Sequence, residues 1–237
     1  MRLSAPIFRL KRQARLLARE TGLPLHDALN RVARSEGFRT WSELAAAVPR
    51  RPAAAEILTR LVPGDLMLLA ARPGHGKTLL ALALLVEASK AGRQGFFFSL
   101  DCTEIEVLRH LRSIGADPKT SEGAFALDTS DDICAGHIVE RMTGTPQGSL
   151  AVVDYLQLLD QRRRNPELGA QVAALRAFTQ AKGSILVMVS QIDRAFDLQG
   201  KALPDLSDVR LPNPLDLTLF TKTCFLHDGE IRLDAVA

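Results

Sequence analysis

The sequence predicts an α/β fold with a mainly parallel sheet, preceded by a small all-α module that is rich in basic residues. Three observations support this: a glycine-rich loop lies between a strand and a helix, short apolar runs alternate with helical segments after residue 53, and the first 48 residues have helical spacing only. Such alternation is typical of right-handed βαβ units, whose parallel sheet carries ligands beyond the carboxyl ends of its strands. A chain of 237 residues that is 46% hydrophobic can bury a sizeable core.

Residues 1–48 are predicted to form a bundle of three short helices. Residues 9–21 and 25–36 place apolar side chains at helical spacing, and a third helix begins at Trp41. The expected core residues are Ile7, Leu17, Leu29, Val32, Phe38 and Trp41. We therefore expect the single tryptophan to pack inside the bundle rather than to stack on bases. A helix-turn-helix DNA reader is an alternative for this module.

The basic charge is concentrated at the amino-terminal end of the chain. Residues 1–52 contain eleven basic and four acidic residues, a net charge of +7, which leaves −4 for the rest because the whole chain carries +3. Such a segment suggests an anionic partner, most commonly nucleic acid, although an ordinary solvated helical surface has the same composition. Residues 49–58, with prolines, arginines and three alanines, are predicted to be a linker to a domain at 59–237.

The central motif is the loop at residues 70–78, Ala-Ala-Arg-Pro-Gly-His-Gly-Lys-Thr. A predicted strand at 65–70 precedes it and a predicted helix at 78–90 follows, which is the context of a phosphate-binding P-loop. Backbone N–H groups would bind a polyphosphate, Lys77 its outer phosphates, and the Thr78 hydroxyl Mg²⁺. Ala71 stands where the general pattern has its first glycine, and a strand–helix turn with chance glycines is the alternative. The predicted nucleotide contacts are Arg72, Pro73, Gly74, His75, Gly76, Lys77, Thr78 and Leu79.

The remaining elements alternate between strands and helices until the carboxy-terminal region. Strands are predicted at 95–100, 124–127, 150–153 and 184–189, and helices at 103–114, 131–142 and 166–181. The helix at 131–142 is expected to open with Asp131 and Asp132 at its positive end. Residues 217–223 and 225–233 are expected to be paired strands that turn at Asp228 and Gly229.

Three residues at the carboxyl ends of strands are candidates for the chemistry. Asp154 follows four apolar residues and would hold Mg²⁺, directly or through water. Asp101 would orient or deprotonate the water that attacks the γ-phosphate, or else cap the helix that begins near residue 103. Gln191 would hydrogen-bond the γ-phosphate or the attacking water, or else be an ordinary loop residue.

Five motifs together resemble the ATPase domain of the bacterial replicative DNA helicase family, the DnaB type of RecA-like fold. They are residues 70–78, Phe98-Ser99-Leu100-Asp101, residues 153–159, residues 189–194 and Leu206-Ser207-Asp208-Val209-Arg210. The likeness spans about residues 60–227, and that family's loop also commonly carries alanine at the place of Ala71.

The resemblance implies a RecA-like P-loop ATPase that uses ATP and Mg²⁺, often as a hexamer, and translocates on single-stranded DNA with replication or repair proteins as further partners. It implies that Lys77 and Thr78 bind phosphate and Mg²⁺, that Asp154 is the second acidic residue, and that Gln191 senses the γ-phosphate. Asp101 stands where the family usually has its catalytic glutamate.

This sequence departs from the family pattern in three places. Asp101 is one methylene shorter than glutamate. The basic module stands where the family has its amino-terminal domain and linker helix. The basic arginine-finger motif that completes a neighbour's site has no clear counterpart in residues 221–237, where Lys222 and Arg232 are the only Lys or Arg residues. Without a finger, turnover would fall on the order of 10³-fold.

Basic residues after two of the strands are candidate DNA contacts: Arg162, Arg163, Arg164, Arg194 and Lys201. Loops of this kind follow phosphates without reading bases. Solvated loops are the alternative.

Three classes of function remain open at this stage: a DNA-dependent ATPase of helicase type, a weakly hydrolysing nucleotide-dependent switch that binds DNA or protein, and a small-molecule kinase. A cytoplasmic protein is expected, because there is no membrane-length apolar run, no secretory signal and no metal-like spacing among Cys102, Cys134 and Cys224.

Overall fold

The computed structural model describes residues 3–5, 7–47, 53–116, 125–160, 165–198, 201, 203–211, 213–227 and 229–236. The chain divides into two compact units: the first contains Met1–Arg51 with Asp228–Glu230, and the second contains Pro52–His227 with Ile231–Ala237.

The first unit is the three-helix bundle that the sequence predicts. Its helices are α1 (Ile7–Thr21), α2 (Leu25–Ser35) and α3 (Trp41–Ala47). The buried core consists of Leu10, Ala14, Ala28, Val32, Ala33 and Leu44. Phe38 and Trp41 are partly buried and pack against this core, which confirms that the tryptophan belongs to the bundle.

The second unit is built on one seven-stranded sheet with the order β3-β2-β4-β5-β1-β6-β7. The strands are β1 (Leu66–Ala71), β2 (Gly95–Ser99), β3 (Ala126–Asp128), β4 (Leu150–Asp154), β5 (Ile185–Gln191), β6 (Lys222–His227) and β7 (Glu230–Ala235). The first six strands in this order pair in parallel, and β6 and β7 form a hairpin at the edge. The predicted α/β class with a mainly parallel sheet is confirmed.

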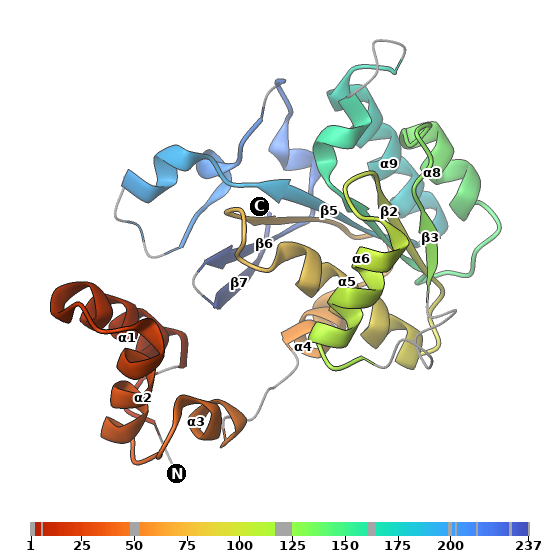
Figure 1. The fold of residues 1–237 in the computed structure, drawn as a ribbon. Helices are drawn as coiled ribbons and strands as arrows, with labels where there is room; N and C mark the ends of the chain where they lie inside the picture. Colours follow the sequence, from red (N-terminus) through yellow and green to blue (C-terminus); the bar gives the residue numbers. More distant parts are fainter. Residues whose placement is uncertain are drawn as a thin grey trace. The chain divides into compact units, whose positions relative to one another are not determined.

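Helices cover both faces of this sheet (Figure 1). They are α4 (Ala53–Arg60), α5 (Lys77–Lys90), α6 (Glu104–Ser113), α8 (Ala135–Met142) and α9 (Leu168–Lys182). In one core, α4, α5 and α6 pack against strand residues such as Leu69, Val152 and Val187. In the other core, α8 and α9 pack against the strand residues next to these in sequence, whose side chains point to the opposite face. Alternate residues of each strand therefore serve different cores, as the two-residue repeat of a strand requires.

Two predicted elements differ from the structure near their amino-terminal ends. Residues 53–58, predicted as part of the linker, belong to α4, because Ile57 and Leu58 are buried in the core that contains α5. Helix α8 starts at Ala135, so Asp131 and Asp132 lie in the preceding turn and the prediction that they open the helix is wrong.

The carboxy-terminal strands also differ from the prediction. Leu217–Leu219 is a short 3-10 helix, η4, rather than part of a strand, because the Asp216 side chain accepts a hydrogen bond from the Thr218 backbone at 2.9 Å. Strand β6 starts at Lys222 and pairs in parallel with β1. The loop at residues 70–78 lies at the carboxyl ends of the parallel strands, which we call the nucleotide edge of the sheet because the sequence predicts a nucleotide there. Three further 3-10 helices lie after β4, after β5 and before β6: η1 (Leu156–Asp160), η2 (Arg194–Leu198) and η3 (Leu206–Asp208).

Candidate nucleotide site

The loop between β1 and α5 has the backbone conformation of a phosphate-binding turn. Gly74 and Gly76 have φ angles of +78° and +84°, and Gly76 is the residue immediately before α5. A Cβ atom at either position would meet nothing within 4 Å, so the left-handed backbone, not lack of space, requires glycine here. The N-terminal N–H groups of α5 have no helical partner and can bind an anion.

The Thr78 hydroxyl and the Asp154 carboxylate meet beside this loop. Thr78 Oγ1 donates a hydrogen bond to Asp154 Oδ2 at 2.7 Å, although the residues are 76 positions apart. Asp154 ends β4 and is 4% exposed. Burial raises the pKa of Asp154, while the Thr78 hydrogen bond and the Lys77 charge oppose that rise. These oxygen ligands fit Mg²⁺, since a hard divalent cation prefers such donors and would offset the cost of burying the charge.

Asp101 lies beyond β2 at the same edge of the sheet. Ser99 ends β2 and pairs with Asp154 across the sheet, and its hydroxyl accepts hydrogen bonds from the backbones of Asp101 and Cys102, both at 3.2 Å. The Asp101 side chain is exposed, and its charge contributes to the raised pKa of Asp154. The two carboxylates therefore act on each other electrostatically.

Helix α6 is capped without Asp101. Thr103 and Glu106 form a capping box, in which the Glu106 backbone donates to the Thr103 hydroxyl at 3.4 Å and the Thr103 backbone donates to the Glu106 carboxylate at 2.9 Å. The alternative interpretation of Asp101 as the helix cap is wrong.

Gln191 lies directly beside the loop because β5 and β1 are neighbours. It pairs with Ala71, the last residue of β1, and the Ile192 backbone donates to the Ala71 carbonyl at 3.1 Å. The chain then returns along this strand end, where the Arg210 backbone donates to the Gln191 carbonyl at 2.8 Å. A main-chain ladder thus joins β1, the predicted sensor and the residues after η3.

Arg72 uses its side chain to tie the loop to η2. Its Nη2 atom lies 2.8 Å from Asp197 Oδ2, its Nε atom donates to both carboxylate oxygens of Asp197, and Nη1 donates to the Ile192 carbonyl at 3.2 Å. The hydrogen bond from Arg72 lowers the pKa of Asp197. The sequence predicted Arg72 as a nucleotide contact and gave no signal for Asp197, 125 positions away.

His75 connects the loop to the end of β6. Its ring stacks on His227, with centroids 4.9 Å apart and planes 9° apart, and Phe196 of η2 meets His227 edge-on at 4.9 Å. This group was missed because the parallel pairing of β6 with β1, which brings His227 to the nucleotide edge, was not predicted.

Two thiols of this unit, those of Cys102 and Cys224, are buried. Burial, followed by the charge of Asp154, raises the pKa of Cys102, and burial raises the pKa of Cys224 to about 12. Both are uncharged core residues at neutral pH.

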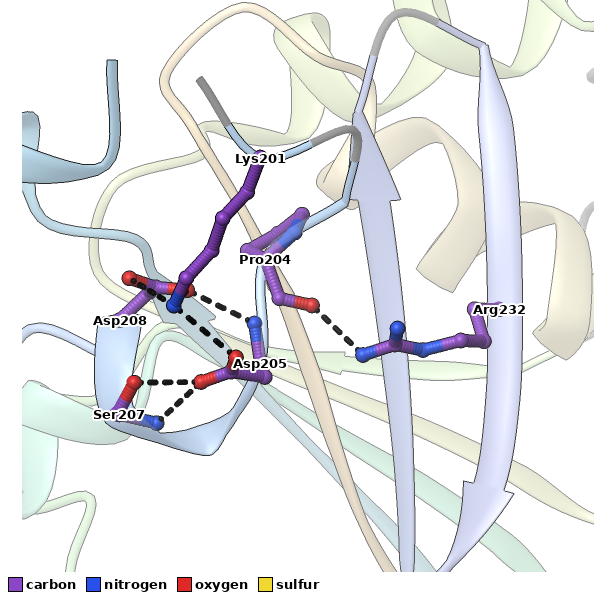
Figure 2. A network of polar contacts seen from close by, with 6 residues as sticks. All are labelled: Lys201, Pro204, Asp205, Ser207, Asp208 and Arg232. Carbon is purple, nitrogen blue, oxygen red and sulfur yellow. Dashed lines mark hydrogen bonds and ion pairs between the residues drawn. The ribbon is translucent and has the colours of Figure 1, made fainter. Parts of the chain in front are cut away.

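The predicted DNA contacts have different environments. Lys201 Nζ lies 3.0 Å from Asp205 Oδ2 and 3.1 Å from Asp208 Oδ2, as Figure 2 shows, and the Asp208 side chain is fully buried. The pKa of Lys201 is raised by these hydrogen bonds, first that to Asp205. Its charge is offset within the chain, which the prediction of a DNA contact did not anticipate. Arg194 is exposed and has no ion pair among the described residues, whereas Arg162, Arg163 and Arg164 lie outside the described residues.

The two carboxy-terminal cations are both engaged inside the chain. Lys222 lies 2.7 Å from the buried Asp65 at the amino end of the sheet, opposite the nucleotide edge. Arg232 donates to the Pro204 carbonyl at 2.8 Å (Figure 2), pairs with Asp234 at 2.8 Å and lies over the Phe225 ring. Neither has the free side chain of an arginine finger.

Comparison with known proteins finds relatives that cover about two thirds of this chain. The replicative DNA helicase DnaB of Mycoplasma genitalium is 25% identical over 197 residues, which cover 67% of this chain and 42% of that protein. The DNA repair protein RadA of Mycobacterium tuberculosis is 27% identical over 158 residues, covering 64% of this chain and 32% of RadA. No protein-family model matches.

Solved structures have the same fold. One solved ATPase domain has a TM-score of 0.59 at 18% identity, and the match covers 79% of this chain and 80% of that domain's chain. A DnaB-like replicative helicase, studied with its interactions with primase, has a TM-score of 0.62 at 17% identity and covers 97% of this chain and 69% of its own. The second unit therefore has the RecA-like fold of these ATPase domains.

The matched relatives are longer than this chain. The chain spans less than half the length of the DnaB and RadA proteins that it matches. A KaiC-like protein from Pyrococcus horikoshii shares the fold with a TM-score of 0.52 at 18% identity, over 70% of this chain and 74% of its own. None of the helices in the described parts of the chain has the length and apolar character needed to cross a bilayer.

Proposed function

We propose that this chain binds ATP with Mg²⁺ and hydrolyses it to move along single-stranded DNA. One observation supports the nucleotide part above all: the Thr78 hydroxyl and the buried Asp154 carboxylate lie 2.7 Å apart beside the phosphate-binding turn. The similarity to DnaB-type helicases supports the DNA part.

Each predicted residue has a distinct task in this proposal. Lys77 and the N–H groups at the start of α5 bind the outer phosphates, and Thr78 and Asp154 hold the cation. Bound Mg²⁺ would neutralise phosphate charge and orient the phosphate oxygens. Asp101 positions or deprotonates the attacking water, and Gln191 senses the γ-phosphate at the edge of the ladder that joins β1 to residues 206–211.

The test is steady-state ATP hydrolysis with and without single-stranded DNA, with the oligomer mass recorded in the same samples. We expect Mg²⁺-dependent hydrolysis that DNA stimulates, together with assembly into a hexamer such as the resembled helicase family often forms. Lys77→Ala is the matched blank, because it removes the phosphate ligand and leaves the fold. Hydrolysis equal to that of the blank, with and without DNA, would reject the motor.

A nucleotide-dependent switch is the second candidate, and a specific observation favours it. Lys222 and Arg232, the two Lys or Arg residues of the carboxy-terminal segment, are both engaged in cis, so neither can complete a neighbour's site as it stands. This candidate predicts that ATP binds with micromolar affinity while turnover stays near that of Lys77→Ala, and that ATP changes the affinity for DNA or a protein partner. Strong stimulation of turnover by DNA would exclude it.

A further inference from the structure

The first unit carries a row of cations on α1 that have no ion-pair partner among the described residues. Lys11, Arg12, Arg15 and Arg19 are all exposed. They lie on the side of α1 away from Leu10 and Ala14, which are buried in the bundle. Three of the four acidic residues of the bundle have other partners: Glu36 accepts hydrogen bonds from Ser4, Glu43 lies 3.7 Å from Arg39, and Asp27 lies 3.1 Å from His26.

This row works against the stability of its own helix. Lys11 and Arg19 are each four positions from Arg15, and Arg12 is three positions from it, so these cations are neighbours on the helix surface. Like charges at these spacings repel and destabilise a helix. A charge pattern that disfavours the isolated fold is best explained by a partner that neutralises it.

We propose that this face of α1 binds the phosphate backbone of DNA without reading its sequence and without needing nucleotide. Lys and Arg side chains that neutralise phosphates release counterions, which supplies sequence-independent affinity. Phe38 and Trp41 pack against the bundle core, are partly buried and lie outside α1, so these two rings add no platform for base stacking to this row of cations. Duplex DNA, with its higher charge density, is therefore the tighter ligand.

An anionic membrane fits this face less well than DNA. A helix that lies in a membrane interface needs an exposed apolar face beside its cations. The apolar face of α1 is used by the bundle core, and among its described side chains Leu16, 47% exposed, is the one large apolar residue at the surface. The charge complementarity is therefore with a polyanion that needs no apolar insertion.

This surface goes beyond the proposed motor, because it belongs to the other unit and acts without ATP. It would keep the ATPase unit near DNA between turnover cycles by raising its effective concentration. Failure of the motor proposal would leave this inference intact, since the two are measured by different quantities.

The experiment measures binding of the full chain to a labelled duplex and to a labelled single strand, without nucleotide, over a series of salt concentrations. The variant is Arg12→Gln/Arg15→Gln/Arg19→Gln. We expect its duplex affinity to fall roughly 10- to 100-fold and the slope of log K against log salt to decrease by about 2 to 3. A charge-matched control, Arg109→Gln/Arg112→Gln/Lys182→Gln, removes three exposed cations of the other unit and should change neither.

Arg15→Gln alone keeps the test decisive if the triple glutamine variant folds poorly, and it should lower the salt slope by about 1. Arg12→Lys/Arg15→Lys/Arg19→Lys retains the charge and should keep the wild-type salt slope. An unchanged salt slope in a folded glutamine variant, or an equal loss in the control, would overturn the proposal. The proposal would also be overturned if the glutamine variant lost binding to vesicles of phosphatidylserine and phosphatidylcholine while it kept its binding to DNA.

Discussion

The two sides of the nucleotide edge are built differently. On the P-loop side, Thr78 follows β1 and Asp154 ends β4, and the two meet because β1 and β4 flank β5 in the parallel sheet and end at the same edge. The Asp154 carboxylate is buried. On the other side, the described residues after β5 include the 3-10 helices η2 and η3, and the Lys201 side chain pairs with Asp205 and Asp208.

The P-loop side is therefore suited to chemistry, whereas the other side is mainly structural. The P-loop side leaves a carboxylate with a raised pKa that a cation would stabilise. After β5, the charge of Lys201 is offset by Asp205 and Asp208, so the basic composition of this segment overstates what it can offer to DNA. Composition predicts a binding surface only where the charges lack partners. Four sets of substitutions test the difference between the two sides, from the largest expected effect to the smallest.

Asp154→Asn should have the largest effect on activity, with Mg²⁺-dependent turnover reduced on the order of 10³-fold or more. Its effect on stability should have the opposite sign. Because burial raises the pKa of Asp154 in the native state, the native state holds the proton more tightly, and this stabilisation is present at low pH and lost as the pH rises through the native pKa.

The asparagine is never charged, so the variant should melt roughly 2–4 °C above wild type at neutral pH in EDTA. The gain should vanish at a pH below the pKa of an unfolded aspartate. The measurement is thermal unfolding by circular dichroism, since the single tryptophan lies in the first unit. An asparagine variant that melts below wild type at neutral pH would contradict the burial argument.

Asp208→Ala should break the network after β5. It removes a fully buried carboxylate that receives Lys201 and the Asp205 backbone, which should cost about 1–3 kcal/mol of unfolding free energy. The readout is urea unfolding by circular dichroism. Ser207→Ala, on the exposed side of the same turn, is the control and should cost roughly 0.5 kcal/mol or less. Equal costs would show that the buried carboxylate has no special role.

Lys201→Gln and Arg194→Gln should separate paired from unpaired cations. If single-stranded DNA passes this segment, the Arg194 variant should lower the salt slope of binding by about 0.7, the value for one phosphate. The Lys201 variant should leave the slope unchanged, because its charge is already offset by Asp205 and Asp208. A salt titration of fluorescence anisotropy measures both, and equal slopes for the two variants would refute the distinction.

The ion pair between Arg72 and Asp197 should give the smallest effect, because Asp197 is half exposed. Arg72→Gln and Asp197→Asn should each raise the KM for ATP roughly two- to fivefold. The double variant should resemble either single one if the contact is what matters. If the increase in KM of the double variant equalled the product of the two single increases, the two residues would act independently and the contact would not matter.

Sequence patterns predicted the parts of the fold that local chemistry decides. The predicted strand that contains Val153 and the strand that leads to Gln191 agree with β4 and β5 within two residues, because continuous apolar runs between turns are typical of buried parallel strands. The P-loop followed from its glycines and its context. The Thr78 hydroxyl contacts the Asp154 carboxylate, and Gln191 pairs with the last residue of β1, while the chemical roles of these residues stay predictions.

The misses came from local turn chemistry in two places and from a contact between distant residues in a third. An apolar pattern around Leu217 and Leu219 favoured a strand, but the cap from Asp216 forms a 3-10 turn there. The start of β6 is held by Lys222 on Asp65, 157 positions away. Local turn chemistry explains the late start of α8, because the Ser130 backbone donates to Asp128 at 3.0 Å and competes with helix formation. The two local turns could have been predicted from Asp216 and Asp128, whereas no sequence window contains both Lys222 and Asp65.

The ladder from Ala71 through Gln191 to Arg210 consists of backbone hydrogen bonds. Substitution of a side chain leaves an N–H and a carbonyl in place at every residue except proline. The link between the phosphate-binding strand and the residues after η3 is therefore robust to mutation, so selection can change the side chains on both sides without uncoupling them. Proline at 192 or 210 is the substitution that would remove a rung.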